Sequence, residues 1–405
     1  MADHVGLTPV LARAGDSWRG WPVAARIALI YGLSRLVTTA IMLLVASGSP
    51  AGSRFGADPS LIDYVLGWDA QWYWLVAVSG YPHELPLAEG GTVAENAWAF
   101  MPVYAHLARL VGFGAWGAGA LVVSLAAGFV ACLALHGLLR RRVDDGAATW
   151  AVTLFASAPL AAMFQVGYAE ALFVAFLLLA LWALSARRWG WLYLLIPLMG
   201  YTRPGILAFA LLLGLYGVHR WWRRRSDPLP VREVLHILAL GALAVLVGFS
   251  WQVIAAVVTG VPDAYLQTEI AWRRGWLPDT TGFVPFEGWI RAAPLWFSLW
   301  GLPTWIGYAA LAVLVLGTAA ALLSRRVRAL GPEVQLWSAS YVLYLLAVFF
   351  PQSSTFRLLL PLSPLWGAAP RSRAGRLITL ALCLLGQWLW IAIMYGSGNT
   401  FWQIP

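Results

Sequence analysis

Acids, amides and arginines stand beside strongly hydrophobic segments at several places in this chain. They are Asp69, Glu170, Arg203, Gln267, Arg273, Arg274, Gln352 and Arg357. A charged group next to lipid costs free energy and usually marks a functional site. An acid in such a set could accept a proton, and arginines could bind phosphate oxygens through paired N–H groups. These residues therefore predict a polar site, provided that the hydrophobic segments bring them to one end of the fold.

The composition predicts an all-α polytopic membrane protein. Of 405 residues, 60% are hydrophobic and 11% are charged, and the mean hydropathy is +0.72. A soluble domain could not keep that much apolar surface from water. The formal net charge is +9, but the arginines form short clusters between apolar runs, which is typical of cytoplasmic loops and not of a nucleic-acid groove. Cys132 and Cys383 both lie inside apolar runs, so we expect neither a disulfide framework nor a thiolate metal site.

Eleven hydrophobic spans are predicted, all in one domain that covers residues 1–405. They are 22–48, 114–139, 147–165, 167–186, 189–201, 204–219, 233–259, 297–323, 334–350, 357–369 and 376–396. Arginine clusters follow alternate spans, and others such as Arg13 and Arg19 precede the first. Placing these clusters in the cytoplasm gives a multi-pass plasma-membrane protein with its N-terminus inside and its C-terminus outside.

Two long loops then lie outside the cell, at 49–113 and 260–296. Loops of this length usually have a function. Apolar residues at helical spacing over 58–80 predict an amphipathic helix that lies in the membrane interface, and a short helix is predicted over 100–111. All the polar residues named above fall at this outer end of the predicted bundle.

Asp69 is the strongest candidate for a catalytic group. It lies among Trp68, Trp72, Tyr73 and Trp74, whose rings could desolvate its carboxylate and suit it to general-base work. Equally, it could be a surface acid flanked by tryptophans of the interface. Glu170 also has two interpretations: it is functional, or it supports helix packing through an ion pair with Arg203 or Arg35.

Arg203, Arg273, Arg274 and Arg357 are among the arginines that face outward, against the general pattern. Arg203 and Arg357 stand at helix starts near the membrane, so we predict that they bind a lipid phosphate, with Arg273 or Arg274 assisting. The histidines show no metal-ligand spacing, and no glycine-rich phosphate loop or nucleophile elbow is present. We therefore expect neither a metal site nor soluble nucleotide chemistry.

Several motifs, in this order, resemble those of the PIG-V-like mannosyltransferases, a family of the GT-C superfamily of membrane glycosyltransferases. They are Trp68–Tyr73 with Gly80–Pro82, Ala99–Tyr104, Tyr168–Glu170, Thr202–Pro204 and Gln352–Arg357. The resemblance extends from about residue 60 to 362. It implies a GT-C-like bundle and an inverting enzyme that passes a sugar, often mannose, from a polyprenyl-phosphate carrier to a hydroxyl on the outer face. It also implies that Asp69 is the base.

On this hypothesis the acceptor is a glycolipid, a glycan or a protein, and neither a cofactor nor nucleic acid takes part. Further contacts to the substrates are predicted for Trp68, Trp72, Tyr73, Glu170, Gln267, Trp272 and Gln352. The alternative from another class is a lipid or sugar transporter, or a flippase, without transferase activity. Transporters tend to show paired repeats with broken helices, and here only Arg35 and the break at Thr202–Pro204 come near that pattern. A non-catalytic scaffold whose outer loops bind partners is the third possibility.

Overall fold

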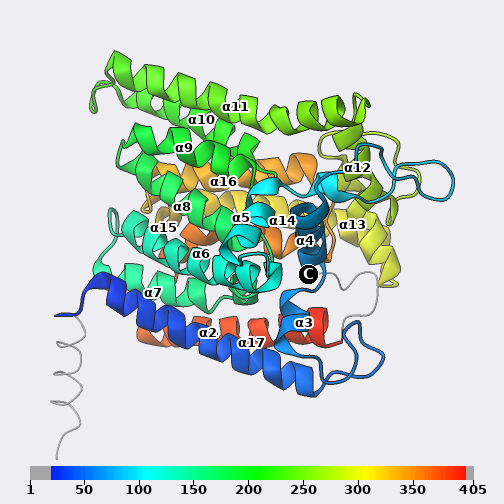
Figure 1. Cartoon of the computed structure of the whole chain (residues 1–405). Coiled ribbons are helices and arrows are strands. Elements are labelled where there is room, and N and C mark those ends of the chain that lie inside the picture. The colour runs from blue at the N-terminus through cyan, green and yellow to red at the C-terminus, as the bar shows by residue number, and fades with distance from the viewer. Residues whose placement is uncertain (1–19, 398–405) are drawn as a thin grey trace, which may run out of the picture.

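A computed structural model describes residues 20–397 and shows an all-helical fold (Figure 1). Arg13 and Arg19 lie outside the described residues. Over the described range no β-strand forms, and the extended backbone pairs only in an isolated bridge between Leu87 and Val93. The α-helices up to the middle of the chain are α2 (Val23–Ser47), α3 (Leu61–Val65), α4 (Asp69–Ser79), α5 (Pro102–Val111), α6 (Trp116–Leu139), α7 (Asp145–Ala156), α8 (Glu170–Ser185), α9 (Trp189–Gly200) and α10 (Ile206–Arg223). The later α-helices are α11 (Val231–Thr259), α12 (Ala264–Arg274), α13 (Glu287–Leu299), α14 (Thr304–Leu322), α15 (Arg325–Arg328), α16 (Pro332–Val348) and α17 (Arg373–Ile391).

Short helical turns of other types connect these elements. They are η1 (Ala97–Ala99), η2 (Ala161–Phe164), η3 (Ser353–Thr355), η4 (Arg357–Ala368) and η5 (Ala392–Gly396). η4 carries Pro361 and Pro364, which lack the backbone N–H that an α-helix needs. This explains why the predicted span at 357–369 forms no regular α-helix.

Five segments of the described chain are long and apolar enough to cross a membrane. They are Val23–Ser47, Trp116–Leu139, Val231–Thr259, Thr304–Leu322 and Arg373–Gly396. Every one of the eleven predicted spans contains a helix. Whether all eleven cross the membrane stays a prediction, as does the single domain.

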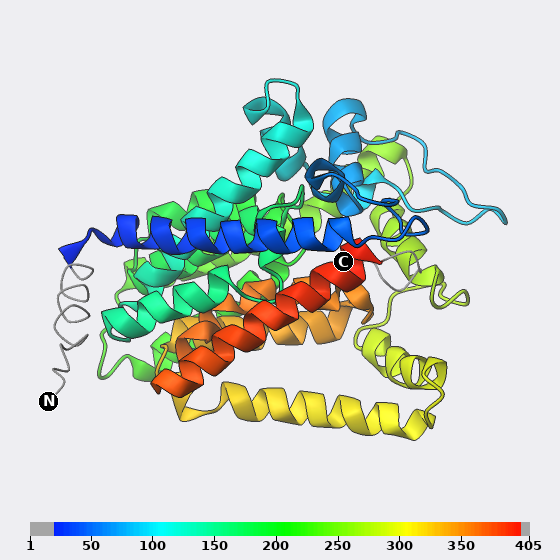
Figure 2. The same ribbon diagram turned by 90° about the horizontal axis from the view of Figure 1, so that it is seen from below.

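The long helices run side by side, and the two predicted outer loops meet at one end of the bundle. In Figure 1 this is the right-hand end, where α3, α4, α12 and α13 gather. Arginines of the loops elsewhere in the bundle join neighbouring helices through ion pairs: Arg142 with Glu333 at 3.6 Å and Arg187 with Asp227 at 2.5 Å. Helix α14 (yellow in Figure 2) lies along one edge and packs mainly against α13.

The amphipathic helix predicted over 58–80 is two helices, α3 and α4. Its interruption has a packing cause: Gly67 lies so close to Phe55 that a Cβ there would meet the ring at 2.5 Å. Trp68 then takes a φ of +54°, which separates α3 from α4 and changes the direction of the chain between them. As a result Asp69 is the first residue of α4 and not a residue in the middle of a longer helix. The second helix predicted in this loop is present as α5.

The predicted span at 147–165 is also interrupted, because α7 ends at Ala156. The buried guanidinium of Arg35 donates to the carbonyl oxygens of Ala156 and Ala161, both at 2.6 Å, and to Oε1 of Gln165 at 3.0 Å. Carbonyls at a helix end have no partner within the helix and attract positive charge. Arg35 thus caps the broken helix, and it is not the ion-pair partner of Glu170.

The second outer loop holds α12 and α13. Helix α13 continues to Leu299, and Gly301 (φ +71°) and Pro303 then separate it from α14. The span predicted from residue 297 therefore begins at Thr304. Asn96 of the first loop and Thr268 of α12, both buried, hydrogen-bond each other at 3.0 Å. This bond fixes one outer loop against the other.

Candidate functional site

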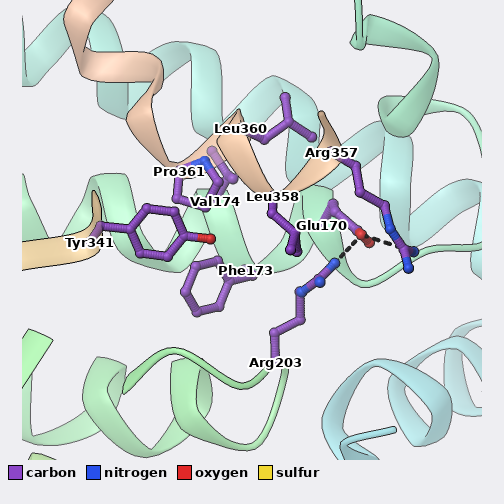
Figure 3. A pocket seen from close by; sticks show the side chains of 9 residues that line it. All are labelled: Glu170, Phe173, Val174, Arg203, Tyr341, Arg357, Leu358, Leu360 and Pro361. Carbon is purple, nitrogen blue, oxygen red and sulfur yellow. Dashed lines mark ion pairs between the residues drawn. The ribbon is translucent and has the colours of Figure 1, made fainter. Parts of the chain in front are cut away.

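Four charged residues from distant parts of the chain, Asp69, Glu170, Arg203 and Arg357, form one ion-pair cluster. Figure 3 shows three of them, Glu170 between Arg203 and Arg357. Asp69, Glu170 and Arg357 are the first residues of α4, α8 and η4, and Arg203 lies in the turn between α9 and α10. The Nη1 atom of Arg357 contacts Asp69 Oδ2 and also lies 3.3 Å from Glu170 Oε1. Glu170 Oε1 also pairs with Nη1 of Arg203. The structure thus brings together Asp69, which the sequence suggests as a base, and Arg203 and Arg357, which it suggests as phosphate-binding residues; their roles stay predictions.

The cluster is largely shielded from water and its charges cancel. The side chain of Glu170 is 3% exposed, that of Arg357 12%, and those of Asp69 and Arg203 15% each. Both acids stand at helix N-termini, where the helix dipole stabilises negative charge. Buried charges persist only when they are paired, and two acids balance two arginines here. Of the two partners proposed for Glu170, the structure selects Arg203.

Two tyrosines fix the shape of the cluster. The ring of Tyr168 lies under the Arg357 guanidinium, 5.3 Å from Cζ to the ring centre, and its hydroxyl accepts the backbone N–H of Asp69 at 3.3 Å. Tyr73, one turn along α4, is buried against Phe100 and Tyr104. Burial raises the pKa of Tyr73 well above its usual range, so it stays a neutral hydroxyl near the charges.

Two cavities adjoin the cluster. The first is a space of about 10 Å³ between Glu170, Arg203, Arg357 and Tyr341, which has room for about one water molecule. The second is a groove of about 720 Å³ whose lining is almost entirely apolar. It lies between the turn after α7, η4 and α17, and it begins at Phe356, directly before Arg357. Leu360 lines both cavities, so the groove lies next to the small space beside the charged cluster.

The predicted aromatic residues divide into two groups. Trp72 stacks on Phe100 and meets Trp272 edge-on, with ring centres 5.6 Å apart in both pairs. Trp68 is engaged elsewhere: Arg54 covers its ring at 4.1 Å, and its indole N–H donates to the carbonyl of Met394 at 3.3 Å. Within this packing of Trp72 and Trp272, the buried indole N–H of Trp272 has no hydrogen-bond partner among residues 20–397.

Four other predicted site residues form no ion pair with this cluster, and each hydrogen-bonds elsewhere in the outer loops. Arg274 donates to the carbonyls of Thr280 and Val93, at 3.3 and 3.2 Å, and Arg273 to that of Val348 at 3.1 Å. Gln267 donates to Asp263 on the surface of α12 at 2.7 Å. Gln352 accepts the indole N–H of Trp276, also at 2.7 Å.

One acid near the cluster was missed by the sequence reasoning. Glu269 lies on α12, and its side chain is exposed to solvent. Burial raises its pKa to about 6, against the opposing effects of a hydrogen bond from Tyr265 and of the charges of Arg273 and Arg203. Its spacing from Tyr265 and Trp272 on one helix was the available signal.

Within the described range, no three His, Cys, Asp or Glu side chains are placed to hold a metal ion. No protein-family model matches the chain, and no curated protein matches it.

Two solved structures of an oligosaccharyltransferase from Archaeoglobus fulgidus show a distant similarity. One, tethered to an acceptor peptide through a disulfide bond, has 14% identity and a TM-score of 0.40 over 90% of this chain and 54% of that chain. The other, a complex with zinc and sulfate, has 14% identity and a TM-score of 0.36 over 89% and 52%. The chain thus spans about half the length of these structures.

Proposed function

We propose that this chain is an inverting membrane glycosyltransferase. It transfers a sugar, mannose in the form we favour, from a polyprenyl-phosphate carrier to a hydroxyl of a glycolipid, glycan or protein on the outer face of the plasma membrane. The observation that carries the proposal is one juxtaposition: a shielded cluster of two acids and two arginines lies near an apolar groove, whose lining includes Phe356, the residue before Arg357. Acid, guanidinium and apolar channel are the three features that a lipid-phosphate sugar donor requires.

In the proposed reaction the acceptor hydroxyl attacks the anomeric carbon as the bond from that carbon to the phosphate oxygen breaks. Asp69 takes the hydroxyl proton, and the lipid phosphate leaves with one more negative charge than it had in the donor. Negative charge therefore moves from Asp69 to the phosphate. An arginine that can contact both Asp69 and the phosphate therefore keeps a negatively charged partner throughout the reaction. Stabilising the charge that develops in the transition state is usually the largest single contribution to catalysis.

Arg357 is placed for this exchange. In the absence of a ligand it contacts Asp69 and lies 3.3 Å from Glu170. The cavity beside it is too small for a phosphate group, so binding of the donor requires the cluster to rearrange. We propose that the phosphate replaces Asp69 as the partner of Arg357, which frees the carboxylate to accept a proton. Glu170 stays paired with Arg203 and holds the second guanidinium in position.

The apolar groove would bind the isoprenoid chain. Its lining offers almost no hydrogen-bonding atoms, and it begins one residue before Arg357. A phosphate at Arg357 would thus leave its lipid chain pointing into the groove along η4 and α17. Trp72 of α4 and Trp272 of α12 meet edge-on, and their rings could contact the sugar.

The test is transfer of radiolabelled mannose from polyprenyl-phosphate mannose to octyl α-mannoside by the purified full chain in proteoliposomes. Asp69→Asn keeps the shape of the side chain but removes the proton acceptor, so turnover should fall about 10²–10⁴-fold while the protein still binds the donor. Asp63→Asn is the matched control, because Asp63 lies on α3 in a cap with Ser60 and should leave turnover unchanged.

Near wild-type turnover by Asp69→Asn would remove Asp69 from the chemistry. A wild-type protein that binds the donor and moves it across the bilayer without transferring sugar would favour the transporter or flippase alternative.

A further inference from the structure

Glu269 differs from the two acids of the cluster in being open. Asp69 and Glu170 are shielded and bound by guanidinium groups. Glu269 forms no ion pair within 4 Å in the part of the chain that the structure describes, and its side chain reaches solvent. An exposed carboxylate with unused oxygen atoms can accept hydrogen bonds from a ligand.

Its neighbours present the groups that bind a polyhydroxylated ring. Tyr265, one turn before it on α12, donates a hydrogen bond to the carboxylate and fixes its orientation. Trp272, one turn after it, carries a buried indole N–H without a partner among the described residues and stands edge-on to Trp72. A pair of adjacent sugar hydroxyls can donate to both oxygens of one carboxylate, while the apolar face of the ring packs on an aromatic side chain.

We propose that Glu269 binds hydroxyl groups of a sugar ring and, with Trp272, forms a sugar subsite on α12. The proposal rests on the proposed transferase function for its place in the reaction, since the sugar belongs either to the donor or to the acceptor. Arg203 is close enough for its charge to lower the pKa of Glu269, so the subsite lies near the ion-pair cluster. The bond between Asn96 and Thr268 holds α12 against the first loop, so the subsite is fixed relative to Asp69.

The proposal predicts a pH dependence. The groups that face Glu269 are Tyr265 and Arg273 on α12, Arg203 in the turn before α10, and Tyr344 on α16. Tyrosine and arginine side chains do not ordinarily titrate between pH 5 and 8. The pKa of Glu269 is about 6, so the carboxylate accepts hydrogen bonds above that pH and loses this capacity as the pH falls through it. Sugar binding should therefore weaken below about pH 6.

The experiment compares the full-length wild type with Glu269→Gln and with Glu89→Gln, an exposed acid in the hairpin of the first loop. Kinetic measurements use polyprenyl-phosphate mannose and octyl α-mannoside. Binding is followed by tryptophan fluorescence with octyl α-mannoside, and tetraethylene glycol monooctyl ether serves as a ligand with the same alkyl chain and no sugar. Since Glu269 is exposed and takes no ion pair, we expect the amide variant to fold.

Glu269→Gln should raise one KM at least about tenfold, as expected for the loss of a hydrogen bond to a charged group. A change in the KM of octyl α-mannoside assigns the sugar to the acceptor, and a change in the KM of the donor assigns it to the donor. The rise in that KM below pH 6 should vanish in the variant, and Glu89→Gln should behave as wild type. Two unchanged KM values would overturn the proposal.

If the wild type transfers no sugar, the proposed function fails. The binding measurement then tests by itself whether Glu269 belongs to a sugar subsite. Weaker binding of octyl α-mannoside by Glu269→Gln, with no change for the sugar-free ether, supports the subsite. Equal binding of octyl α-mannoside by both proteins overturns it.

Discussion

Replacing Glu170 by Gln tests whether the ion-pair cluster is as dry as its geometry indicates. Glu170 is the only carboxylate that pairs with Arg203 within residues 20–397, whereas Arg357 keeps Asp69 when Glu170 is neutralised. The variant thus leaves one buried guanidinium without a counter-charge. Removing one partner of a buried pair typically costs about 3–5 kcal/mol, so we expect a loss of that size in the free energy of unfolding.

The measurement is a denaturation curve of the purified protein in mixed micelles of rising SDS content, followed by tryptophan fluorescence. A double-mutant cycle with Arg203→Met isolates the pair, and its coupling energy should be about 1–3 kcal/mol because the double variant buries no lone charge. Glu287→Gln is the control. Glu287 pairs with Arg291 at 3.4 Å on the half-exposed surface of α13, where such a pair contributes about 0.2–1 kcal/mol.

A loss below about 1 kcal/mol for Glu170→Gln, equal to that of the control, would refute the reasoning. It would mean that water reaches the cluster and screens its charges.

Two further predictions follow from the packing of the first loop and of α7. Gly67→Ala places a methyl group against the ring of Phe55, so it should destabilise the protein by about 1–3 kcal/mol in the same SDS assay. Because it shifts the start of α4, it should also reduce sugar transfer. Wild-type stability would show that the turn tolerates a Cβ. The hydrogen bond from Arg26 lowers the pKa of Asp145 below its value in the unfolded chain, so this stabilisation is complete above about pH 4 and is lost as the pH falls through the folded value. Asp145→Asn should lack this acid-dependent loss in thermal unfolding between pH 5 and 3, and an unchanged pH profile would contradict the assignment.

The sequence predicted the helices and the charged residues of the cluster because both carry local signals. Apolar runs set the helices, and Asp69, Glu170, Arg203 and Arg357 are conspicuous as charges beside lipid. The pair of Glu170 with Arg203 was one of two alternatives that the sequence suggested. The pairing of Arg357 with Asp69 and Glu170 could not be predicted, since it depends on how η4 lies against α8. The break before α4 depends on Phe55 filling the space beside Gly67, which is a tertiary contact and leaves no trace in helical periodicity.

The surroundings of other site residues could not be predicted for a similar reason. Arg274 and Gln352 are predicted to bind substrates, and in the structure Arg274 donates to backbone carbonyls while Gln352 accepts an indole N–H. Glu269 looked like one more polar residue of α12. Which charged and aromatic groups surround an acid depends on tertiary packing, which local sequence does not encode.

The separation of Asp69 and Arg357 along the chain, 288 residues, implies an order of assembly. A ribosome completes the first outer loop long before η4, because the chain emerges from its N-terminus. Glu170 can meet Arg203 as soon as α10 is inserted, but Asp69 has no guanidinium partner until residue 357 arrives. We expect a nascent chain that ends before η4 to hold a half-formed cluster and an unfilled wall of the groove. Such an intermediate would expose an unpaired acid to chaperones and quality-control proteases, and its lifetime would depend on how fast the last three helices enter the membrane.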